Sequence, residues 1–320
     1  ETVLRYIILG LILAGLFQVF FWITQDNKVT LKQNASERFE SLSYAPFEGY
    51  DKKVLSPEQI KEDISILINH TNKVRTYATA DAKVILEVAS KTNMMVDLGL
   101  WLSGDHEENH KEIQRGLELL KKYPNNINNV IVGNETLLRT DLNEVELMAY
   151  LDFVKGFTKK PITTAEVWHT LDKYPEIGNH VDFITVHFLP YWENVPIEQF
   201  NNFIIEKYSI IEKKYPNKKI TIGETGWPSH GYNKNGAVPS LKNQAIAISN
   251  FIALAKEKNW SYNIVEAFDQ PWKGYDEGNV GQYWGIFTTD RSLKFYLNGD
   301  IELNQYWFYQ MIAAIIIGAL

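Results

Sequence analysis

The sequence predicts an α/β protein, a (β/α)8 TIM barrel flanked by transmembrane helices. Eight short runs rich in β-branched residues alternate with amphipathic helical patterns over roughly 250 residues, the length of one such barrel. Long apolar stretches lie near both ends of the 320-residue chain. A doubly wound open sheet is the alternative. However, no glycine-rich phosphate loop begins the first helix, which counts against the nucleotide-binding form of that sheet.

Residues 1–24 are predicted to form a transmembrane anchor. Within them, only Arg5 and Gln18 break the apolar stretch 3–23, and about 20 such residues cross a bilayer as a helix. Trp22 would lie at the membrane interface, where tryptophan is favoured. A cleaved signal peptide is the alternative, but the run is long for one and no small-x-small cleavage site follows it. The polar residues 25–41 are expected to form a linker.

The predicted barrel covers residues 42–300. Its expected strands are 42–47, 73–77, 94–102, 129–134, 161–167, 181–188, 219–223 and 263–268. The first helix is expected to begin at Ser56, because a capping serine, a first-turn proline and early acidic residues precede an apolar helical pattern. Further helices are expected over 105–123, 143–157, 196–215 and 239–258, with a short, weak one over 172–179.

The sequence becomes apolar again near its C-terminus. Residues 304–320 are predicted to begin a second transmembrane segment, and a buried terminal helix is the alternative. The chain starts with Glu rather than Met and stops within this apolar run. We therefore expect it to be an excerpt of a larger membrane protein. Arg5 weakly favours a cytoplasmic N-terminus and an extracytoplasmic barrel.

Composition excludes several classes of function. The net charge of -7 and the pI of about 5.6 argue against a nucleic-acid partner. The absence of cysteine excludes disulfides, cysteine-ligated zinc and a thiol nucleophile. His187 has no second histidine at ligand spacing, and no H-E-x-x-H motif occurs. We therefore expect neither a metal nor another cofactor.

Two glutamates are the strongest candidates for chemistry. Glu135 and Glu224 each end a short apolar run, where a carboxylate is costly to desolvate without a use. The active site of a (β/α)8 barrel lies at the C-terminal ends of its strands, so the two carboxyl groups should meet there. A protonated acid beside an ionised nucleophile is the arrangement that glycoside cleavage needs. Glu135 would then protonate the leaving oxygen, and Glu224 would attack the anomeric carbon.

Other polar and aromatic residues are predicted at the same strand ends. The candidates for substrate binding are Asn134, Tyr77, Trp101, Glu166, His187, Tyr191, Trp227, Glu266, Asp269 and Trp272. For Trp101 and Trp272, the alternative to a sugar platform is core packing. His187 either lines the site as a hydrogen-bond partner or is a core histidine. Glu166 and Asp269 either tune Glu224 or form plain ion pairs.

Two motifs give the chain a resemblance to a known family. Gly133-Asn134-Glu135 and Gly223-Glu224-Thr225-Gly226-Trp227-Pro228-Ser229 resemble the acid/base and nucleophile signatures of glycoside hydrolase family 17. Similar segments occur at 44–47, 74–77, 266–273 and 283–287, so the resemblance covers roughly residues 42–290. It implies a retaining β-1,3-glucan hydrolase or glucanosyltransferase, with Glu135 as acid/base and Glu224 as nucleophile.

One departure indicates a branch of that family. Plant members usually carry a glutamate where this chain has Gln270, and the sequence Phe-Asp-Gln-Pro-Trp-Lys is more similar to the bacterial branch. That branch implies a barrel anchored in the inner membrane on its periplasmic side, often fused to a family 2 glycosyltransferase. The leading hypothesis is therefore a transglycosylase that remodels β-glucan from a coupled synthase. An extracytoplasmic β-1,3-glucan hydrolase and a non-catalytic glycan-guiding module are the alternatives.

Overall fold

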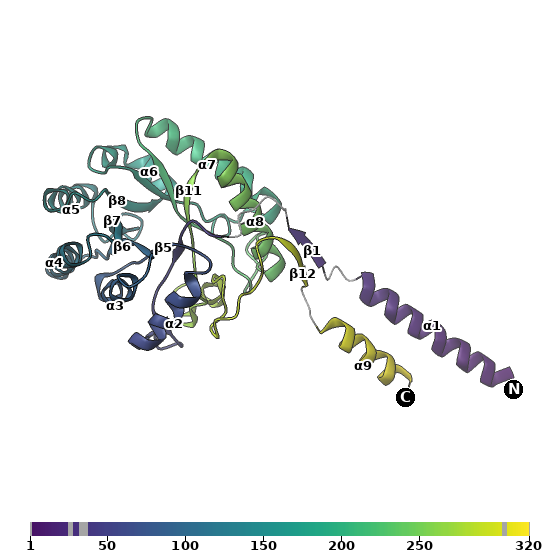
Figure 1. Ribbon diagram of the computed structural model, residues 1–320. Coiled ribbons are helices and arrows are strands. Elements are labelled where there is room, and N and C mark those ends of the chain that lie inside the picture. Colours follow the sequence, from purple (N-terminus) through teal and green to yellow (C-terminus); the bar gives the residue numbers. More distant parts are fainter. Residues whose placement is uncertain (1, 25–27, 32–37, 303–305, 320) are drawn as a thin grey trace.

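A computed structural model describes residues 2–24, 28–31, 38–302 and 306–319. Parallel strands close into a barrel in the order β10-β11-β2-β5-β6-β7-β8-β9 (Figure 1). The predicted (β/α)8 barrel is therefore confirmed and the open sheet is wrong. The barrel strands are β2 (Leu42–Ser43), β5 (Lys73–Arg75), β6 (Met95–Leu100), β7 (Ile127–Asn134), β8 (Ile162–Val167), β9 (Ile184–His187), β10 (Ile220–Thr225) and β11 (Ser261–Ile264). A hairpin of β3 (Phe47–Glu48) and β4 (Lys53–Val54) follows the first of them.

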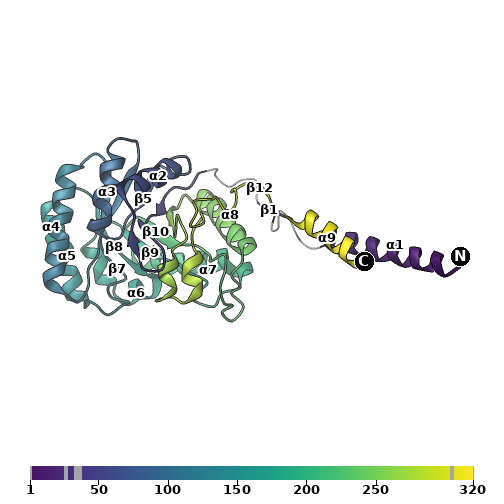
Figure 2. The ribbon, with the colours of Figure 1, turned by 90° about the horizontal axis from the view of Figure 1, so that it is seen from below.

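Helices surround the barrel, and α4 and α5 form one flank of it (Figure 2). The α-helices are α2 (Pro57–Leu67), α3 (Thr79–Ala89), α4 (His106–Lys122), α5 (Glu144–Phe157), α6 (Trp168–Lys173), α7 (Phe200–Lys214) and α8 (Leu241–Lys258). Short 3-10 helices are η1 (Pro175–Asn179), η2 (Ile197–Gln199), η3 (Pro271–Gly274) and η4 (Asn279–Tyr283). Side-chain caps fix several helix starts. Ser56 accepts a hydrogen bond from the Gln59 amide, and Asn143 forms a capping box with Glu146.

Several element boundaries differ from the prediction; the first strand, for example, ends at Ser43 rather than at residue 47. The last barrel strand ends at Ile264, whereas the predicted strand runs to residue 268. Beyond Ile264 the backbone also bonds to the closing segment, since Glu266 N donates to Trp284 O and Phe287 N to Ala267 O. Bonds to the neighbouring strands alternate with these, from Val265 N to Thr225 O and from Ala267 N to Ser43 O. The helix expected over 172–179 begins earlier, at Trp168, and its second half is the 3-10 helix η1.

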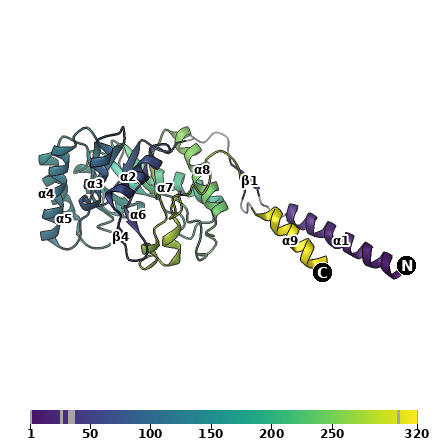
Figure 3. The same cartoon turned by 60° about the horizontal axis from the view of Figure 1, so that its bottom comes forward.

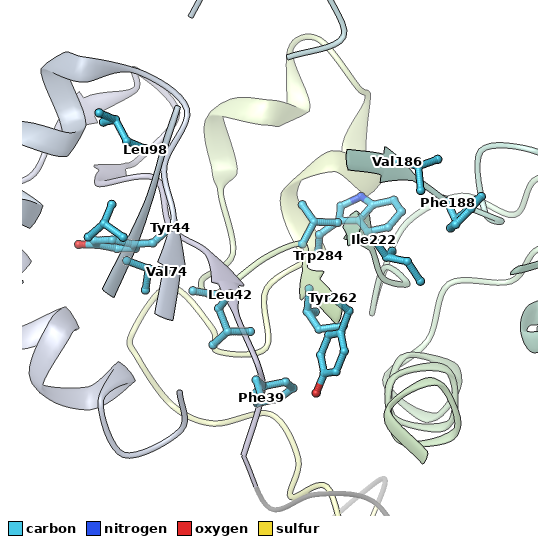
Figure 4. Packing of buried hydrophobic residues seen from close by; sticks show 14 of the residues in the cluster. Phe39, Leu42, Tyr44, Val74, Leu98, Val186, Phe188, Ile222, Tyr262 and Trp284 are labelled. Atoms are coloured by element: carbon cyan, nitrogen blue, oxygen red, sulfur yellow. The ribbon is translucent and has the colours of Figure 1, made fainter. Parts of the chain in front are cut away.

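The core lies inside the barrel and between the strands and the helices. Figure 4 shows Leu42 and Ile222 near the aromatic rings of Tyr262 and Trp284, with Val74 of the same cluster beside Tyr44. Branched side chains suit this position because they pack well against the pleated surface of a sheet. Fully burying one such side chain stabilises the fold by about 1.5–3 kcal/mol. This packed core provides a rigid support for the loops at the strand ends.

The two ends of the chain leave the barrel together. Strand β1 (Lys28–Leu31) pairs antiparallel with β12 (Gly299–Glu302), and helices α1 (Thr2–Thr24) and α9 (Trp307–Ala319) lie side by side beyond this pair (Figure 3). Within the described residues, Leu4–Ile23 is the helical segment long and apolar enough to cross a membrane. The predicted linker 25–41 thus contains a strand, although its residues 25–27 and 32–37 lie outside the described part. The second predicted membrane segment is helix α9 over most of its length, and this helix packs beside α1. A buried terminal helix was the alternative prediction. Residues 304–305 and 320 of that segment lie outside the described part of the chain.

Candidate active site

The two predicted glutamates meet at the C-terminal ends of the barrel strands. Glu135 directly follows β7, and Glu224 lies near the end of β10. An oxygen of each carboxyl group and a ring nitrogen of His187 all lie within 4.8 Å of one another. Because Glu224 and His187 are Cα partners on neighbouring strands, the sheet register itself brings them together. The site therefore contains two carboxyl groups with an imidazole between them.

A tight turn holds Glu135, and a buried carboxyl group supports this turn. Gly133 and Glu135 both have left-handed backbone conformations, with φ of 82° and 53°. The Glu166 carboxylate accepts hydrogen bonds from the backbone amides of Leu137 at 2.8 Å and Leu138 at 3.4 Å. Burial raises the pKa of Glu166 to about 7, against the lowering effect of these amides. Glu166 is fully buried, so the structure places it beneath the turn rather than on the substrate face predicted for it.

Glu224 is held as an ionised carboxylate. Its Oε1 accepts a hydrogen bond from the Tyr77 hydroxyl at 2.8 Å and lies 3.3 Å from Nη1 of Arg75. Burial raises the pKa of Glu224, but neighbouring groups that include the Arg75 and Lys273 charges and the Tyr77 hydroxyl outweigh burial and lower it. A carboxylate that stays ionised while buried is suited to act as a nucleophile.

Arg75 is the central cation of the site. Its side chain is buried and donates hydrogen bonds to Gly223 O at 2.6 Å and to Asn134 Oδ1 at 2.5 Å. The guanidinium thereby links three barrel strands and fixes the orientation of the Asn134 amide. Arg75 was not among the predicted site residues. The signal that could have identified it is a charge inside a short apolar strand, where burial is costly without partners.

His187 lies between the two glutamates and is fully buried. Its Nδ1 is 2.7 Å from Oε1 of Glu135, and its Nε2 is 3.1 Å from Nη1 of Arg75. The two glutamates and His187 are spaced closely enough to hold a cation. However, the Arg75 guanidinium already faces both His187 and Glu224, and its permanent charge would repel a metal ion. The arrangement instead fits two carboxyl groups that are each hydrogen-bonded to a neighbouring side chain, Glu135 to His187 and Glu224 to Tyr77.

A second charged group borders Glu224. Lys273 Nζ is 3.0 Å from Oε2 of Glu266, and both side chains are largely buried. Burial raises the pKa of Glu266 to about 7. Burial also raises the pKa of Glu277. Lys273 lowers this pKa, whereas the charges of Glu224 and Glu135 raise it. Glu266 was predicted to bind substrate, and the structure pairs it with Lys273. Glu277 was missed because neither of the two motifs includes it.

Two of the predicted aromatic platforms are at least partly exposed to solvent. Trp101 is 41% exposed, and the Arg139 guanidinium lies 4.3 Å from the centre of its ring. Trp272 is partly buried, donates from its indole nitrogen to Gln270 Oε1 at 2.7 Å, and has Lys52 over its ring at 4.2 Å. Both rings are thus held in fixed orientations, as stacking against a sugar requires.

Other predicted binding residues are parts of the core. Trp227 is fully buried and packs edge-on against Tyr191 and Phe200, so it presents no face to a substrate. Tyr191 is also buried, and its hydroxyl donates to Tyr232 O at 2.7 Å. This burial counts against their prediction as substrate contacts, which no binding observation tests; position after a strand does not reveal whether a loop side chain turns inward. Asp269 forms the alternative ion pair: its Oδ1 lies 2.7 Å from Lys294 Nζ.

A separate groove lies on the outside of the barrel. It has a volume of about 850 Å³ and lies between α7 and α8, with Phe200, Ile205 and Leu254 among its lining residues. Neither Glu135 nor Glu224 lines this groove. The chemistry that the paired carboxyl groups indicate is therefore located at the strand ends.

Comparisons with known proteins give consistent results. The family described as the BtgE/BtgC glycoside hydrolase domain matches residues 41–285. A glucan 1,3-beta-glucosidase of Arthroderma benhamiae is 32% identical over 271 residues, which cover 77% of this chain and 85% of that protein. The corresponding enzyme of Saccharomyces cerevisiae is 24% identical over 274 residues, covering 77% and 87%. A structure of an active-site mutant of Rhizomucor miehei beta-1,3-glucanosyltransferase, in complex with laminaritriose, superposes with a TM-score of 0.74 at 26% identity, covering 81% of this chain and 97% of that one.

Proposed function

The chain belongs to the BtgE/BtgC glycoside hydrolase domain family, and from this premise we propose that it is a retaining enzyme acting on β-1,3-glucan or a related β-glucan. The relatives named as glucan 1,3-beta-glucosidases and the glucanosyltransferase solved with laminaritriose support this substrate class. The observation that carries the mechanism is the close pair of carboxyl groups, with oxygens of Glu135 and Glu224 within 4.8 Å. Retaining glycosidases use carboxyl groups about 5–5.5 Å apart, whereas inverting enzymes separate them further.

Glu224 is the proposed nucleophile. Its carboxylate attacks the anomeric carbon while Glu135 donates a proton to the leaving oxygen, which gives a covalent glycosyl-enzyme. Glu135, now ionised, then removes a proton from an incoming hydroxyl, and the ester to Glu224 is cleaved. Water as acceptor gives hydrolysis, and a sugar hydroxyl gives transglycosylation. Because Asn134 Oδ1 accepts from Arg75, the Asn134 amide N–H groups remain for a sugar hydroxyl, which we assign to the 2-position.

The membrane is a second proposed partner. Helix α1 is apolar over Leu4–Ile23, and α9 lies beside it, so both helices would insert into the same bilayer. We place the barrel on the periplasmic side of an inner membrane, next to a fused or associated family 2 glycosyltransferase that supplies the glucan. This placement rests on the resemblance to the bacterial branch and on Arg5 at the start of α1. Extraction of the full chain by detergent but not by alkaline carbonate is the expected result in membrane fractions.

The decisive experiment incubates the full chain, in detergent, with defined β-1,3-gluco-oligosaccharides and follows product sizes by mass spectrometry. Products longer than the substrate establish transglycosylation, and only shorter ones establish a hydrolase. Both activities should be lost in Glu224→Gln, which keeps the shape of the side chain but removes the nucleophile. Oligosaccharide binding without turnover by the unaltered chain would instead favour a glycan-guiding module. Turnover by Glu224→Gln equal to that of the unaltered chain would refute the mechanism.

A further inference from the structure

The imidazole of His187 has polar neighbours at both ring nitrogens. Nδ1 lies 2.7 Å from Oε1 of Glu135, while Nε2 lies 3.1 Å from Nη1 of Arg75 and 3.8 Å from Oε1 of Glu224. The ring is fully buried, so none of these neighbours exchanges easily with water. Which nitrogen carries the proton therefore determines what the ring does for each carboxyl group.

Arg75 determines the position of that proton. A guanidinium carries only N–H donors and stays charged throughout the pH range in which proteins are folded. One N–H of Nη1 donates to Gly223 O at 2.6 Å, and the other is directed toward Nε2 of His187 and Oε1 of Glu224. Nε2 can accept this hydrogen bond only without a proton, so the neutral ring is protonated on Nδ1. The Nδ1–H group then donates to Oε1 of Glu135.

The backbone around the ring maintains this arrangement. His187 and Glu224 are Cα partners in β9 and β10, so they cannot shift along the sheet independently. A Cβ atom at Gly223 would lie 2.4 Å from Thr185 Cγ2 and 3.1 Å from both Arg75 Nη1 and His187 Cδ2. The glycine therefore leaves the room in which these three side chains lie together. The ring is therefore held in one orientation.

We propose that His187 is a positioning residue that acts through Glu135. Its Nδ1–H group keeps Oε1 of Glu135 as an acceptor, so the transferable proton is on Oε2. In the first half-reaction the O–H bond at Oε2 breaks and its proton passes to the glycosidic oxygen. In the second half-reaction Oε2 takes a proton from the incoming hydroxyl. The imidazole proton stays on Nδ1 throughout, because a proton on Nε2 would face the Arg75 guanidinium. This inference rests on the proposed function.

Two amide variants of His187 test whether its hydrogen bond to Glu135 matters independently of the rest of the ring. The side-chain nitrogen of asparagine lies near the position of imidazole Nδ1, and that of glutamine lies near Nε2. His187→Asn therefore keeps an N–H donor for Glu135. His187→Gln places its amide at Arg75, where its oxygen accepts the guanidinium hydrogen bond, and leaves Oε1 of Glu135 without a donor. Folding of each variant, as the full chain in detergent, is checked by circular dichroism and thermal unfolding.

Two substrates reveal which step the variants affect. A β-1,3-gluco-oligosaccharide needs its leaving oxygen protonated, whereas the leaving group of a 2,4-dinitrophenyl β-laminaribioside departs as a stable anion. The measured quantity is kcat/KM, because it includes no step after the first irreversible one and so excludes the half-reaction in which Glu135 is the base. General acid catalysis contributes about 10²–10⁴-fold, so we expect His187→Gln to lose at least about tenfold on the oligosaccharide. On the dinitrophenyl substrate the loss should stay below about threefold, and His187→Asn should keep most activity on both.

The outcomes distinguish a failure of the proposed role of His187 from a failure of the proposed function. Equal losses on both substrates in His187→Gln would overturn the proposal, since they would indicate a structural role or an action through Glu224. Full activity of His187→Gln on the oligosaccharide would also overturn it, as would unfolding of both variants, which would make His187 a core residue. If the unaltered chain turns over neither substrate, the proposed function fails instead.

Discussion

Arg75→Lys tests whether one guanidinium organises both the barrel interior and the site. The substitution keeps the positive charge but replaces a planar fork by a single ammonium group. Lysine can approach Glu224, yet it cannot also reach Gly223 O and Asn134 Oδ1, which Arg75 bonds at 2.6 Å and 2.5 Å. Hydrogen bonds to charged groups contribute about 1.5–3 kcal/mol each, so losing two lowers the free energy of unfolding by about 3–6 kcal/mol.

The assay for Arg75→Lys is thermal unfolding of the full chain in detergent. A change of 1 kcal/mol moves Tm by about 2–4 °C in a domain of this size, so a fall of about 6–24 °C is expected. Activity on β-1,3-gluco-oligosaccharides should fall about 10²-fold, because Asn134 and Glu224 lose their orientation. Arg115→Lys is the matched control: the Arg115 side chain is 48% exposed and donates to Glu112 and to Thr79 Oγ1 at the surface, so we expect a change below about 1 kcal/mol. A loss below about 1 kcal/mol in Arg75→Lys, with activity retained, would refute the reasoning.

Two further predictions concern the supports of the site. Burial raises the pKa of Glu166 to about 7, so folding favours its protonated form; the resulting stability is complete below its ordinary pKa of 4.5 and is lost as pH rises through about 7. Denaturant unfolding should therefore show that the free energy of unfolding declines more steeply between pH 4.5 and about 7 for the unaltered chain than for Glu166→Gln. Parallel declines of the two proteins with pH would contradict this prediction. Trp227→Phe should lower the free energy of unfolding by about 1–3 kcal/mol without changing KM, since it loses buried volume and the hydrogen bond to Val238 O. Trp101→Ala should raise KM and leave the free energy of unfolding nearly unchanged. A raised KM in Trp227→Phe would contradict the reasoning, because it would mean that the Trp227 ring contacts glucan.

The barrel and its two glutamates follow from local sequence patterns. Each glutamate ends an apolar run, and closure of a barrel brings all such ends to one mouth whatever the details of packing. Sequence analysis therefore identifies Glu135 and Glu224 as neighbours without knowing which strands touch. The helix starts are equally local, because a cap such as Ser56 or Asn143 bonds within its own first turn.

The remaining features depend on contacts across the barrel. Arg75 is central only because its side chain crosses the interior to Gly223, and no pattern within its own strand reveals that distance. Trp227 and Tyr191 follow strands just as Trp101 does, yet their loops fold inward and bury them. The last strand ends early because the segment around Trp284 supplies its hydrogen-bond partners. Such pairings are set by the assembled fold and not by the residues next to them.

The pairing of β1 with β12 also indicates how the barrel can be joined to the helices on either side of it. Leu31 and Gly299 are register partners, so the entry and exit of the barrel are one strand spacing apart, about 4.8 Å. A domain whose ends are adjacent can be placed within a loop of another protein without separating the elements on either side. Here the neighbouring elements are α1 and α9, which still pack against each other. The barrel is thus topologically an insertion into the turn of a helical hairpin, and a short loop from Leu31 to Gly299 could replace it with the hairpin left intact.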